Sequence, residues 1–515
     1  MNAQRPPTSR QTARRATQPL AVAVDVGTTG ARAAAYSLDG RLIAQARRGY
    51  RTRFPKPGWA EQDPEDWAAG AIEALGRLAG RLGSRAAAIR AVGLTGQCPT
   101  VAAFDSRIRP VGPGMLYRDN RAVTEARRMS QAVGETEYHR RTGHVPTAFH
   151  VGAKVLWLRD HDAEAFRRAW CFLQPRDLVL HRLTGVLGTD ETHANATLFY
   201  DLRARAWDGE LLARFGIGPQ LFPPVMPPWQ VTGVLSEQVA GDLRLRPGIP
   251  VIIGAADSQC AAYGAGLTGP GPISEMAGAS SCLNSVVAEP LCDVRVTHYS
   301  YLLPGCYCTE RGVNTTGAAW DWAVSRLGYP GHLELAADAE RQHRKMARAA
   351  VPAAEAAPLF LPYLGDGERD DPSARGAFLG LSDRHDRTAL AFAVIEGVAL
   401  AVTVVIESLR DAGALAGELR VGGGGAGLPL AGQIKADLLG VPVRHLDLDP
   451  AGVGAAMLAA SAAGMPDESR AAIAAAVARA RIFGPVPSGR EREQVRLDWF
   501  RQAVRRPSAS AGAAR

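Results

Sequence analysis

One aspartate of this chain follows a short apolar run and precedes a polar, glycine-containing turn. Asp25 comes directly after Leu20–Val24, and Gly27–Thr29 lead from it toward Arg32. A carboxylate at the end of a buried strand can hold Mg²⁺ directly or through water. The amides and hydroxyls of the turn can bind phosphate oxygens, and Arg32 can add a charge-assisted contact. An isolated Asp-x-Gly turn more often only ends a strand, so this motif alone does not establish a site.

A second aspartate, Asp257, follows the apolar run Val251–Gly254 and begins an alanine-rich stretch. We expect a strand that leads into a helix here. Ligands of open α/β sheets bind outside the carboxyl ends of the strands, where Asp257 could accept a proton from a substrate hydroxyl. Taken alone, its position favours the simpler role of a helix N-cap.

A glycine-rich segment at 422–427 satisfies G-x-G-x-x-G between an expected strand and an expected helix, and Asp447 lies about 20 residues further on. These features fit a dinucleotide-binding fingerprint and make a nicotinamide-dependent oxidoreductase an alternative hypothesis. The loop after Asp25 argues against that fold, because it leads into a hairpin at Asp39-Gly40 and not into a helix.

Short apolar runs predict strands, and longer periodic stretches predict helices. The expected strands are 20–24, 31–38, 41–46, 89–94, 251–254, 273–278, 282–288, 419–421 and 441–446, and the expected helices are 64–82, 386–412, one beginning at 257 and one ending at 439. Proline-rich breaks occur at 223–228 and 246–250. We therefore expect two α/β halves joined near 246–250.

Length and composition indicate a soluble protein of two or more domains. The chain has 515 residues, of which 46% are hydrophobic and 21% charged, and Glu396 interrupts its most apolar stretch. Four arginines in 1–20 and four in 501–515 account for the net charge of +8. We therefore expect disordered basic tails, no nucleic-acid binding by the folded part and no membrane span.

Lysine and cysteine usage excludes some classes of site. None of the four lysines precedes Ser or Thr, which excludes a standard P-loop. The seven cysteines are odd in number and follow no evident export signal, which favours a reducing, cytoplasmic compartment.

Taken in order, several segments resemble the FGGY family of carbohydrate kinases, and its xylulokinase members most closely. The resemblance runs from about residue 21 to about residue 460. The segments that carry it are DVGTTGAR (25–32), GWAEQDPEDW (58–67), GLTGQ (93–97), YRDNRA (117–122), GAADSQCAAYGAG (254–266), FLPYLGDGER (360–369), ARGAFLGLSDRH (374–385), VIEGVA (394–399) and GGGGAGLPLAGQIKADLLGVPV (422–443). Each segment is weak evidence alone, but their common order is specific.

The resemblance implies an α/β fold of two actin-like (ribonuclease H-like) ATPase domains with a cleft between them. It implies a sugar-binding N-terminal domain at 20–249 and a C-terminal domain at 250–500 that carries the catalytic aspartate and binds ATP, with disordered tails at 1–19 and 501–515. The implied cofactors are ATP and Mg²⁺, the implied partner is a small-molecule sugar, and a homodimer is a further expectation.

The resemblance also implies roles for particular residues. Asp257 would accept the proton of a sugar hydroxyl, and Asp25 would hold Mg²⁺. The residues expected to bind ATP are Gly27, Thr28, Thr29, Arg32, Gly278, Ala279, Ser280, Gly423, Gly424 and Gly425. The residues expected to contact the sugar are Gln97, Cys98, Pro99, Asp119 and Asp257.

Three departures from the family pattern bear on the substrate and on activity. Ala279 stands where the second phosphate turn usually has Thr, Cys98-Pro99 where xylulokinases have Met-His, and Ser258 where Asn or Gln often follows the catalytic aspartate. D-xylulose is the first expectation, and ribulose, glycerol and erythritol are alternatives. A catalytically silent sugar or nucleotide sensor is the alternative from another class, against which the intact Asp25 and Asp257 argue.

Overall fold

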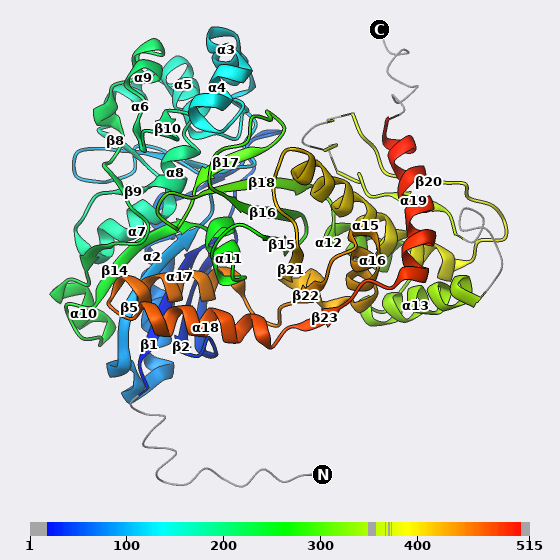
Figure 1. Ribbon diagram of the computed structural model, residues 1–515. Coiled ribbons are helices and arrows are strands. Elements are labelled where there is room, and N and C mark those ends of the chain that lie inside the picture. Colours follow the sequence, from blue (N-terminus) through cyan, green and yellow to red (C-terminus); the bar gives the residue numbers. More distant parts are fainter. Residues whose placement is uncertain (1–17, 349–356, 366, 369–370, 372, 506–515) are drawn as a thin grey trace, which may run out of the picture. The chain divides into compact units, whose positions relative to one another are not determined.

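The computed structural model describes residues 18–348, 357–365, 367–368, 371 and 373–505, which form two compact units (Figure 1). The first unit comprises the described residues up to Gly266, together with Ala288–Cys308 and Asp449–Ala478. The second comprises Leu267–Val287, Thr309–Leu448 and the described residues from Arg479 onward.

A six-stranded mixed sheet forms the centre of the first unit. Its strands are, in spatial order, β13 (Val231–Val234), β14 (Pro250–Ala256), β5 (Ile89–Gly96), β1 (Leu20–Val26), β2 (Gly30–Ser37) and β3 (Leu42–Gly49). β1 runs parallel to β5 and β5 parallel to β14, whereas β2, β3 and β13 are antiparallel to their neighbours. The predicted hairpin at Asp39-Gly40 joins β2 to β3 and is confirmed.

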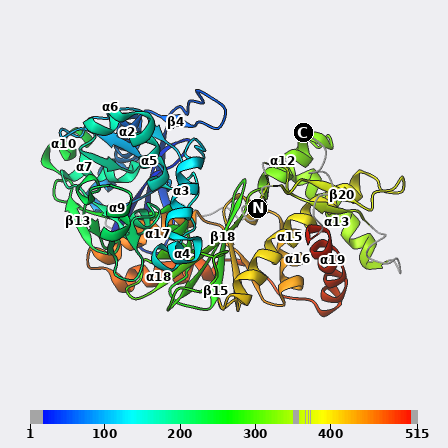
Figure 2. The ribbon, with the colours of Figure 1, turned by 90° about the horizontal axis from the view of Figure 1, so that it is seen from above.

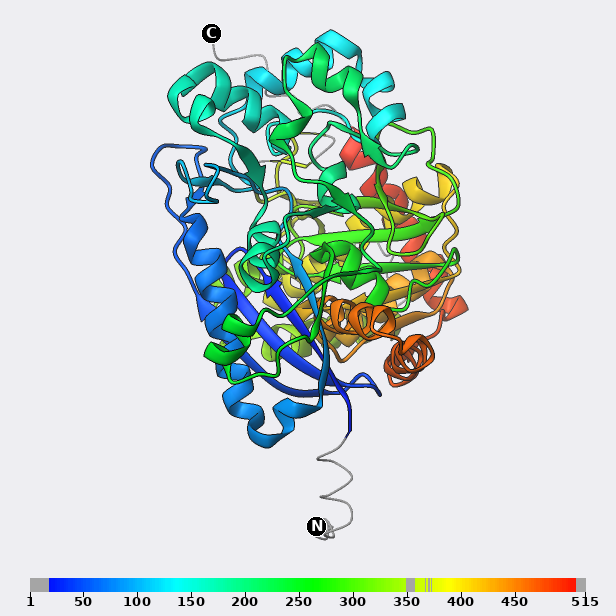
Figure 3. The ribbon, with the colours of Figure 1, turned by 90° about the vertical axis from the view of Figure 1, so that its left-hand side faces the viewer.

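Helices cover both faces of this sheet. Val92 and Leu94 of β5 pack into a core with α2 (Pro64–Leu82) and α7 (Pro175–Thr184). The alternate residue Ala91 points to the other face and packs with Ala459 of α17 (Pro450–Ala462). Figures 2 and 3 show α2 and α17 on opposite sides of the strands. Because both faces are buried, the central strands are almost wholly apolar.

The alanine- and glycine-rich composition of α17 allows it to pack closely against α11 (Asp257–Gly264). A Cβ at Gly264 would overlap the carbonyl oxygen of Pro450, and a Cβ at Gly454 would overlap that of Cys260. The two helix backbones are therefore in direct contact, which fixes α11 against a helix from a distant part of the sequence.

The second unit contains a sheet with the same strand order. Six neighbouring strands of this seven-stranded sheet are, in spatial order, β18 (Tyr307–Val313), β16 (Ser281–Val287), β15 (Pro272–Ala277), β21 (Glu418–Gly422), β22 (Val443–His445) and β23 (Arg481–Phe483). β15 is antiparallel to β16 and parallel to β21, β21 is parallel to β22, and β22 is antiparallel to β23. The same directions relate β1, β2, β5, β14 and β13, so the two sheets form a structural repeat.

Helices α12 (Gly317–Arg326), α13 (His332–Arg348), α15 (Arg387–Asp411), α16 (Pro429–Leu439) and α19 (Pro487–Arg505) belong to the second unit. Figure 2 shows α15, α16 and α19 beside one another. Among the described residues, α15 is the one helix long and apolar enough to cross a membrane, but 83% of its most apolar window is buried. Its Glu396 pairs with Arg496 of α19, and both side chains are fully buried. This helix is therefore a core helix of the unit.

Shorter elements complete the described chain. They are β4 (Glu61–Gln62), η1 (Gly83–Ala88), β6 (Ala102–Phe104), β7 (Gly114–Met115), α3 (Val123–Val133), α4 (Glu135–Thr142), α5 (Val151–His161), α6 (Ala163–Arg168), β8 (Cys171–Leu173), β9 (Thr189–Asp190), α8 (Glu191–Asn195), β10 (Tyr200–Asp201), β11 (Ala206–Trp207), α9 (Gly209–Arg214), η2 (Pro219–Leu221), β12 (Val225–Met226), α10 (Glu237–Leu243), β17 (Thr297–Ser300), β19 (Leu359–Leu361), β20 (Ala377–Leu379), η3 (Gly424–Gly427) and α18 (Pro466–Ala478).

The structure confirms the predicted α/β class and the main strands but differs from the predicted division of the chain. We predicted that the second domain begins at residue 250. Strand β14 instead pairs with β5, so Asp257 belongs to the first unit, as do residues 449–478. The predicted tail from 501 is also wrong at its start, because α19 continues to Arg505. Residues 1–17 and 506–515 of the predicted tails lie outside the described residues.

Candidate active site

Hydrogen bonds within its own backbone and from a neighbouring segment hold the turn from β1 to β2, residues 27–29. Gly27 N donates to Gly30 O at 3.1 Å, and Gln62 Nε2 donates to Thr28 O at 2.6 Å. Gln62 Oε1 in turn accepts a hydrogen bond from Trp67 Nε1 at 2.8 Å. The 58–67 segment, one of those that carry the family resemblance, therefore supports the turn.

Arg32 lies opposite Asp25 across the β1–β2 pair and bridges two carboxylates. Its Nη2 lies 3.5 Å from Asp25 Oδ2 and also donates to Asp449 Oδ2, which accepts a second hydrogen bond from Tyr36 OH at 3.2 Å. Burial raises the pKa of Asp25 to about 6, and the charge of Arg32 opposes that rise. The sequence analysis missed Asp449, although an aspartate directly before Pro450 signals a helix start.

The protein side of this cluster suits Mg²⁺. Among the described residues, no group of three or more His, Cys, Asp and Glu side chains could hold a metal ion. Mg²⁺ commonly binds to one or two carboxylates and completes its coordination with water and substrate phosphates. The half-buried Asp25 beside a phosphate-sized turn therefore fits this ion without further protein ligands.

Asp257 lies at the same edge of the first sheet as Asp25. Thr95 of β5 is in register with Asp25 on one side and with Ala255 of β14 on the other. Two strand spacings, about 10 Å in all, therefore separate the backbones at these positions. Asp257 follows two residues later, so one ligand at this edge could contact both carboxylates.

Asp257 does not serve as the N-cap of α11. Ala256 occupies that position and makes no side-chain capping bond. The partly exposed Asp257 is the first helical residue, and its Oδ1 accepts a hydrogen bond from Ser258 N at 2.8 Å.

The predicted sugar-contact residues that follow β5 differ in how far their side chains are buried. Gln97 is buried, and its side chain bonds to Gln62 Oε1 at 3.2 Å and to Thr100 Oγ1 at 3.1 Å. Cys98 is half-buried, with its Sγ 3.7 Å from Gln174 Oε1, whereas Pro99 is buried. Of these three side chains, Cys98 is the one that remains partly accessible.

Asp119, another predicted sugar-contact residue, is bonded to neighbouring loops. It is fully buried; its Oδ2 accepts from Ala60 N at 2.7 Å, and both of its oxygens accept hydrogen bonds from the Arg121 side chain. Arg121 also bonds to Glu61 at 2.7 Å and lies 3.5 Å from the centre of the Trp59 ring. This carboxylate therefore holds the loop at 117–122 to the 58–67 segment.

Lys154 joins three loops of the first unit and was not identified from the sequence. Its ammonium group is fully buried and donates to the carbonyl oxygens of Leu116 (2.7 Å), Phe149 (2.6 Å) and Pro99 (3.3 Å). Burial lowers the pKa of Lys154 to about 7. The lysine therefore fixes the backbone on which Cys98 and Pro99 lie.

The second unit brings its own two predicted loops together. Parallel strands β15 and β21 end side by side, with Met276 in register with Gly422. The turn at Gly278, Ala279 and Ser280 follows β15, and Gly423, Gly424 and Gly425 follow β21, with the last two in η3. The two loops therefore lie at one edge of the second sheet.

A third loop contacts this turn and was missed from the sequence. Thr316 N donates to Ala279 O at 3.0 Å, and Gly317 N donates to Gly278 O at 3.1 Å. The tripeptide Thr315-Thr316-Gly317 repeats the Thr-Thr-Gly of residues 28–30, which is the sequence signal that could have revealed it.

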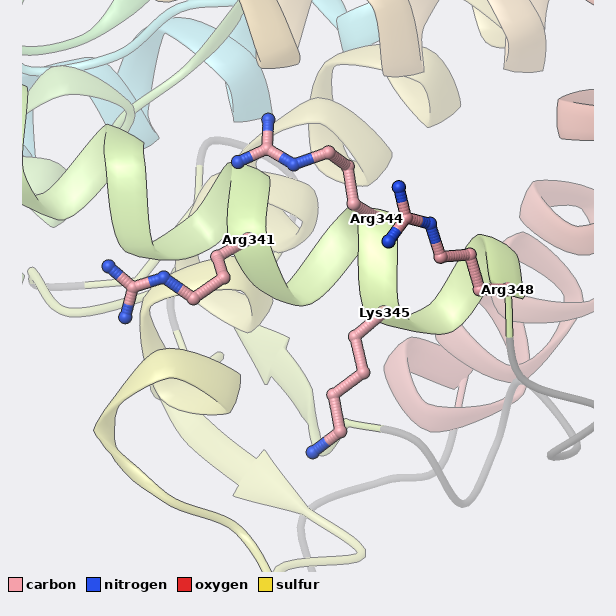
Figure 4. A pocket seen from close by; sticks show the side chains of 4 residues that line it. All are labelled: Arg341, Arg344, Lys345 and Arg348. Carbon is pink, nitrogen blue, oxygen red and sulfur yellow. The ribbon is translucent and has the colours of Figure 1, made fainter.

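A separate cationic surface lies on α13. Arg341, Arg344, Lys345 and Arg348 line a hollow of about 430 Å³ (Figure 4). Two of these side chains already pair with acids of the same helix, Arg341 with Asp338 and Arg344 with Glu340. These pairs are typical of a solvated helix face.

Comparisons with known proteins agree with this geometry. The model of the N-terminal domain of the FGGY family of carbohydrate kinases matches residues 20–264, and that of the C-terminal domain matches residues 275–463. A xylulose kinase of Bacillus subtilis is 28% identical over 86% of this chain and 88% of its own length. A glycerol kinase of Citrifermentans bemidjiense is 31% identical over 93% of this chain and 97% of its own.

Solved structures show the same fold. The crystal structure of xylulose kinase from Rhodospirillum rubrum has a TM-score of 0.86 and 29% identity, and the match covers 94% of this chain and 98% of that one. The predicted two-domain fold, with actin-like (ribonuclease H-like) ATPase domains, is thereby confirmed.

Proposed function

This chain belongs to the FGGY family of carbohydrate kinases and is an ATP-dependent phosphotransferase, and we propose that it phosphorylates a ketopentose, with D-xylulose as the first candidate. The observation that carries the assignment of residues is the shared sheet edge. Three parallel strands end side by side around Thr95, and this edge carries Asp25 near the end of β1, the turn at 27–29 after β1, and Asp257 after β14.

In the proposed reaction, Asp257 accepts the proton of a primary sugar hydroxyl as that oxygen attacks the γ-phosphoryl group of ATP. Phosphoryl transfer depends mostly on positioning and on neutralising charge. The amides of Thr28 and Thr29 would bind phosphate oxygens, since the amide of Gly27 already donates to Gly30 O, and Arg32 would add a cation. Asp25 would hold Mg²⁺, which supplies positive charge to the phosphates when it is bound.

We propose that the second unit binds the nucleotide. The amides of Ala279 and Ser280 would contact phosphate, since the amide of Gly278 already donates to Ser280 O. The glycines 423–425 would allow close approach of the adenosine because they carry no side chain. The adjacent ends of β15 and β21 support a common ligand for these two loops.

The comparisons do not distinguish between acceptors, because xylulose kinases and glycerol kinases match the chain at similar identity. In the loop after β5, Pro99 has no amide hydrogen and the Cys98 thiol lies near Gln174. Ribulose, glycerol and erythritol are therefore retained as candidates, and a silent sensor is the contrasting hypothesis. We further propose a cytoplasmic enzyme that uses Mg²⁺ and that can form homodimers.

The test is ADP release with MgATP and a panel of D-xylulose, D- and L-ribulose, L-xylulose, glycerol and erythritol. Asp257→Asn should lose at least about 100-fold of kcat because it removes the general base. Asp242→Asn, on the exposed surface of α10 in the same unit, is the matched control and should leave kcat unchanged. Turnover of no acceptor would overturn the kinase activity, and full activity of Asp257→Asn would overturn the assigned base.

A further inference from the structure

Strand β14 departs from regular pairing just before it reaches Asp257. The register between β14 and β5 shifts between Ile252 and Ala255, and Gly254 has a φ of +65°. A Cβ at Gly254 would overlap the carbonyl oxygen of Leu94, so this position requires glycine. A bulge of this kind redirects the chain that follows it, and bulges are common beside active sites. The direction of Asp257 therefore depends on how the peptides after the bulge are held.

Two buried threonines hold one of those peptides, the group between Ala255 and Ala256, from its two sides. Thr95 Oγ1, from β5, donates to the carbonyl oxygen of Ala255 at 2.9 Å. Thr192 Oγ1, from α8, accepts a hydrogen bond from Ala256 N at 2.9 Å. Both threonine side chains are fully buried. The Ala255–Ala256 peptide group, which lies one residue before Asp257, is thus fixed at both its carbonyl and its amide by side-chain hydroxyls from different elements.

The hydroxyl of Thr192 has a fixed polarity. It donates to Asp190 Oδ2 at 2.7 Å, and the amide of Thr192 donates to the same oxygen at 2.7 Å. An ionised carboxylate can only accept hydrogen bonds, so the hydroxyl hydrogen is committed to Asp190. The hydroxyl oxygen then presents a lone pair to Ala256 N.

The charge on Asp190 is itself maintained by buried partners. Burial alone would raise its pKa, but the Arg176 guanidinium and hydrogen bonds from His193 and Thr192 hold the pKa of Asp190 below its usual value. Arg176, Asp190 and His193 are all fully buried.

This network is poorly suited to a purely stabilising role. Arg176 Nε and Nη1 have no hydrogen-bond partner among the described residues, and buried ion pairs generally add little net stability because desolvation offsets their attraction. The hydroxyl of Thr192, which holds Ala256, connects this network to the segment that carries Asp257.

We propose that Thr192, oriented by the Arg176–Asp190 pair, is a positioning residue that fixes Asp257 for proton transfer. This inference rests on the proposed function, in which Asp257 is the base. Thr192 does not touch the substrate; it acts through the Ala255–Ala256 peptide, one residue before Asp257. A displacement of about 1 Å at a reacting group can cost about 100-fold in rate, so a small shift of this peptide has a measurable effect.

The test replaces the hydroxyl while keeping the shape of the side chain. Thr192→Val should lower kcat by about 10- to 100-fold and leave the KM values for sugar and ATP within about twofold, because the binding groups remain in place. Thr192→Ser keeps the hydroxyl and should recover most of the lost kcat. Thr184→Val removes a threonine hydroxyl that bonds to Leu180 O within α7, and as the matched control it should retain full kcat. Thr192→Ala is the second variant if Thr192→Val does not fold.

Three results overturn the proposal: unchanged kcat in Thr192→Val, equal loss of kcat in Thr192→Ser, or a loss confined to KM. The failure of the proposed function is recognised separately. If Asp257→Asn is fully active, the assigned base is wrong. If Asp257→Asn is inactive while Thr192→Val is fully active, the base is retained and Thr192 alone has no positioning role.

Discussion

The first and second sheets have corresponding turns, but the residue pairs beside those turns differ in charge. In the first sheet, Asp25 stands two residues before the turn and pairs across β1 and β2 with Arg32. In the second, Met276 stands two residues before the turn at 278–280 and pairs across β15 and β16 with Cys282. Gly27 N donates to Gly30 O at 3.1 Å and Gly278 N donates to Ser280 O at 2.9 Å, so the first turn is one residue longer. An antiparallel strand pair thus carries a charged pair in one unit and an uncharged pair in the other.

The two units also bury lysine in different ways. In the first unit, three carbonyl oxygens surround Lys154, whereas in the second Lys435 pairs with the Glu275 carboxylate at 2.6 Å. These differences show that the repeat conserves the path of the chain and not its charges. Charged groups at the sheet edge are therefore a better guide to chemistry than the fold that both units share.

The largest effect should come from removing the charge that distinguishes the first turn. Asp25→Asn should lower kcat/KM for MgATP by about 100-fold or more, because it removes a preorganised charge beside the phosphates. Met276→Leu, at the equivalent position of the second sheet, should change it by less than about twofold, since volume-conserving apolar substitutions are well tolerated. Steady-state kinetics of both variants measure these changes in kcat/KM, and equal losses in the two variants would refute the prediction.

The buried Lys154 should make stability depend on pH. Its pKa of about 7 in the folded chain lies below that of an exposed lysine. Between about pH 7 and pH 10, the unfolded chain therefore binds more protons at this site, so rising pH favours the folded state. We expect the stability of the parent chain, relative to Lys154→Met, to rise by about 1.4 kcal/mol per pH unit in this range. Urea unfolding at several pH values measures this slope, and a flat difference would contradict it.

A smaller effect is expected from the second carboxylate that holds Arg32. Asp449→Asn weakens the charged bond to Arg32, which should lower kcat/KM for MgATP by about tenfold. Tyr36→Phe removes the other hydrogen bond to Asp449 and serves as the milder control, with a loss of about threefold or less. The prediction is refuted if Tyr36→Phe has the larger effect.

The smallest predicted effect restores a hydroxyl to the second turn. Ala279 is exposed, so threonine has room there. One additional hydrogen bond to phosphate should tighten ATP binding by about threefold in Ala279→Thr. Thr28→Ala removes the equivalent hydroxyl from the first turn and should weaken binding by a similar factor. Calorimetric titration with ATP measures both, and weaker binding by Ala279→Thr would contradict the prediction.

Local signals in the sequence predicted individual elements well. The helix at 64–82 has the predicted bounds because Asp63 caps it and Pro64 occupies its first turn. The strand before Asp257 was also predicted, but its membership in the first sheet depends on pairing with β5, which no local pattern encodes. The same limit explains the incorrect domain boundary.

Parts of the candidate site were not predictable for a similar reason. Asp119 was expected to face a sugar, but the direction of its carboxylate is set by Ala60 and Arg121, which folding brings to it. Lys154 and Thr192 act on the carbonyl or amide groups of distant segments, and any residue type can supply those groups. No composition or spacing therefore marks them.

The return of α17 to the first unit determines when that unit can be completed during synthesis on the ribosome. Residues 449–478 cover one face of the first sheet and contact α11, which begins with Asp257. Translation must therefore pass through most of the second unit before the last part of the first emerges. Until then, the apolar face around Ala91 and Ile252 lacks its helix. The usual order, in which an N-terminal domain folds before the next is made, is not available to this chain.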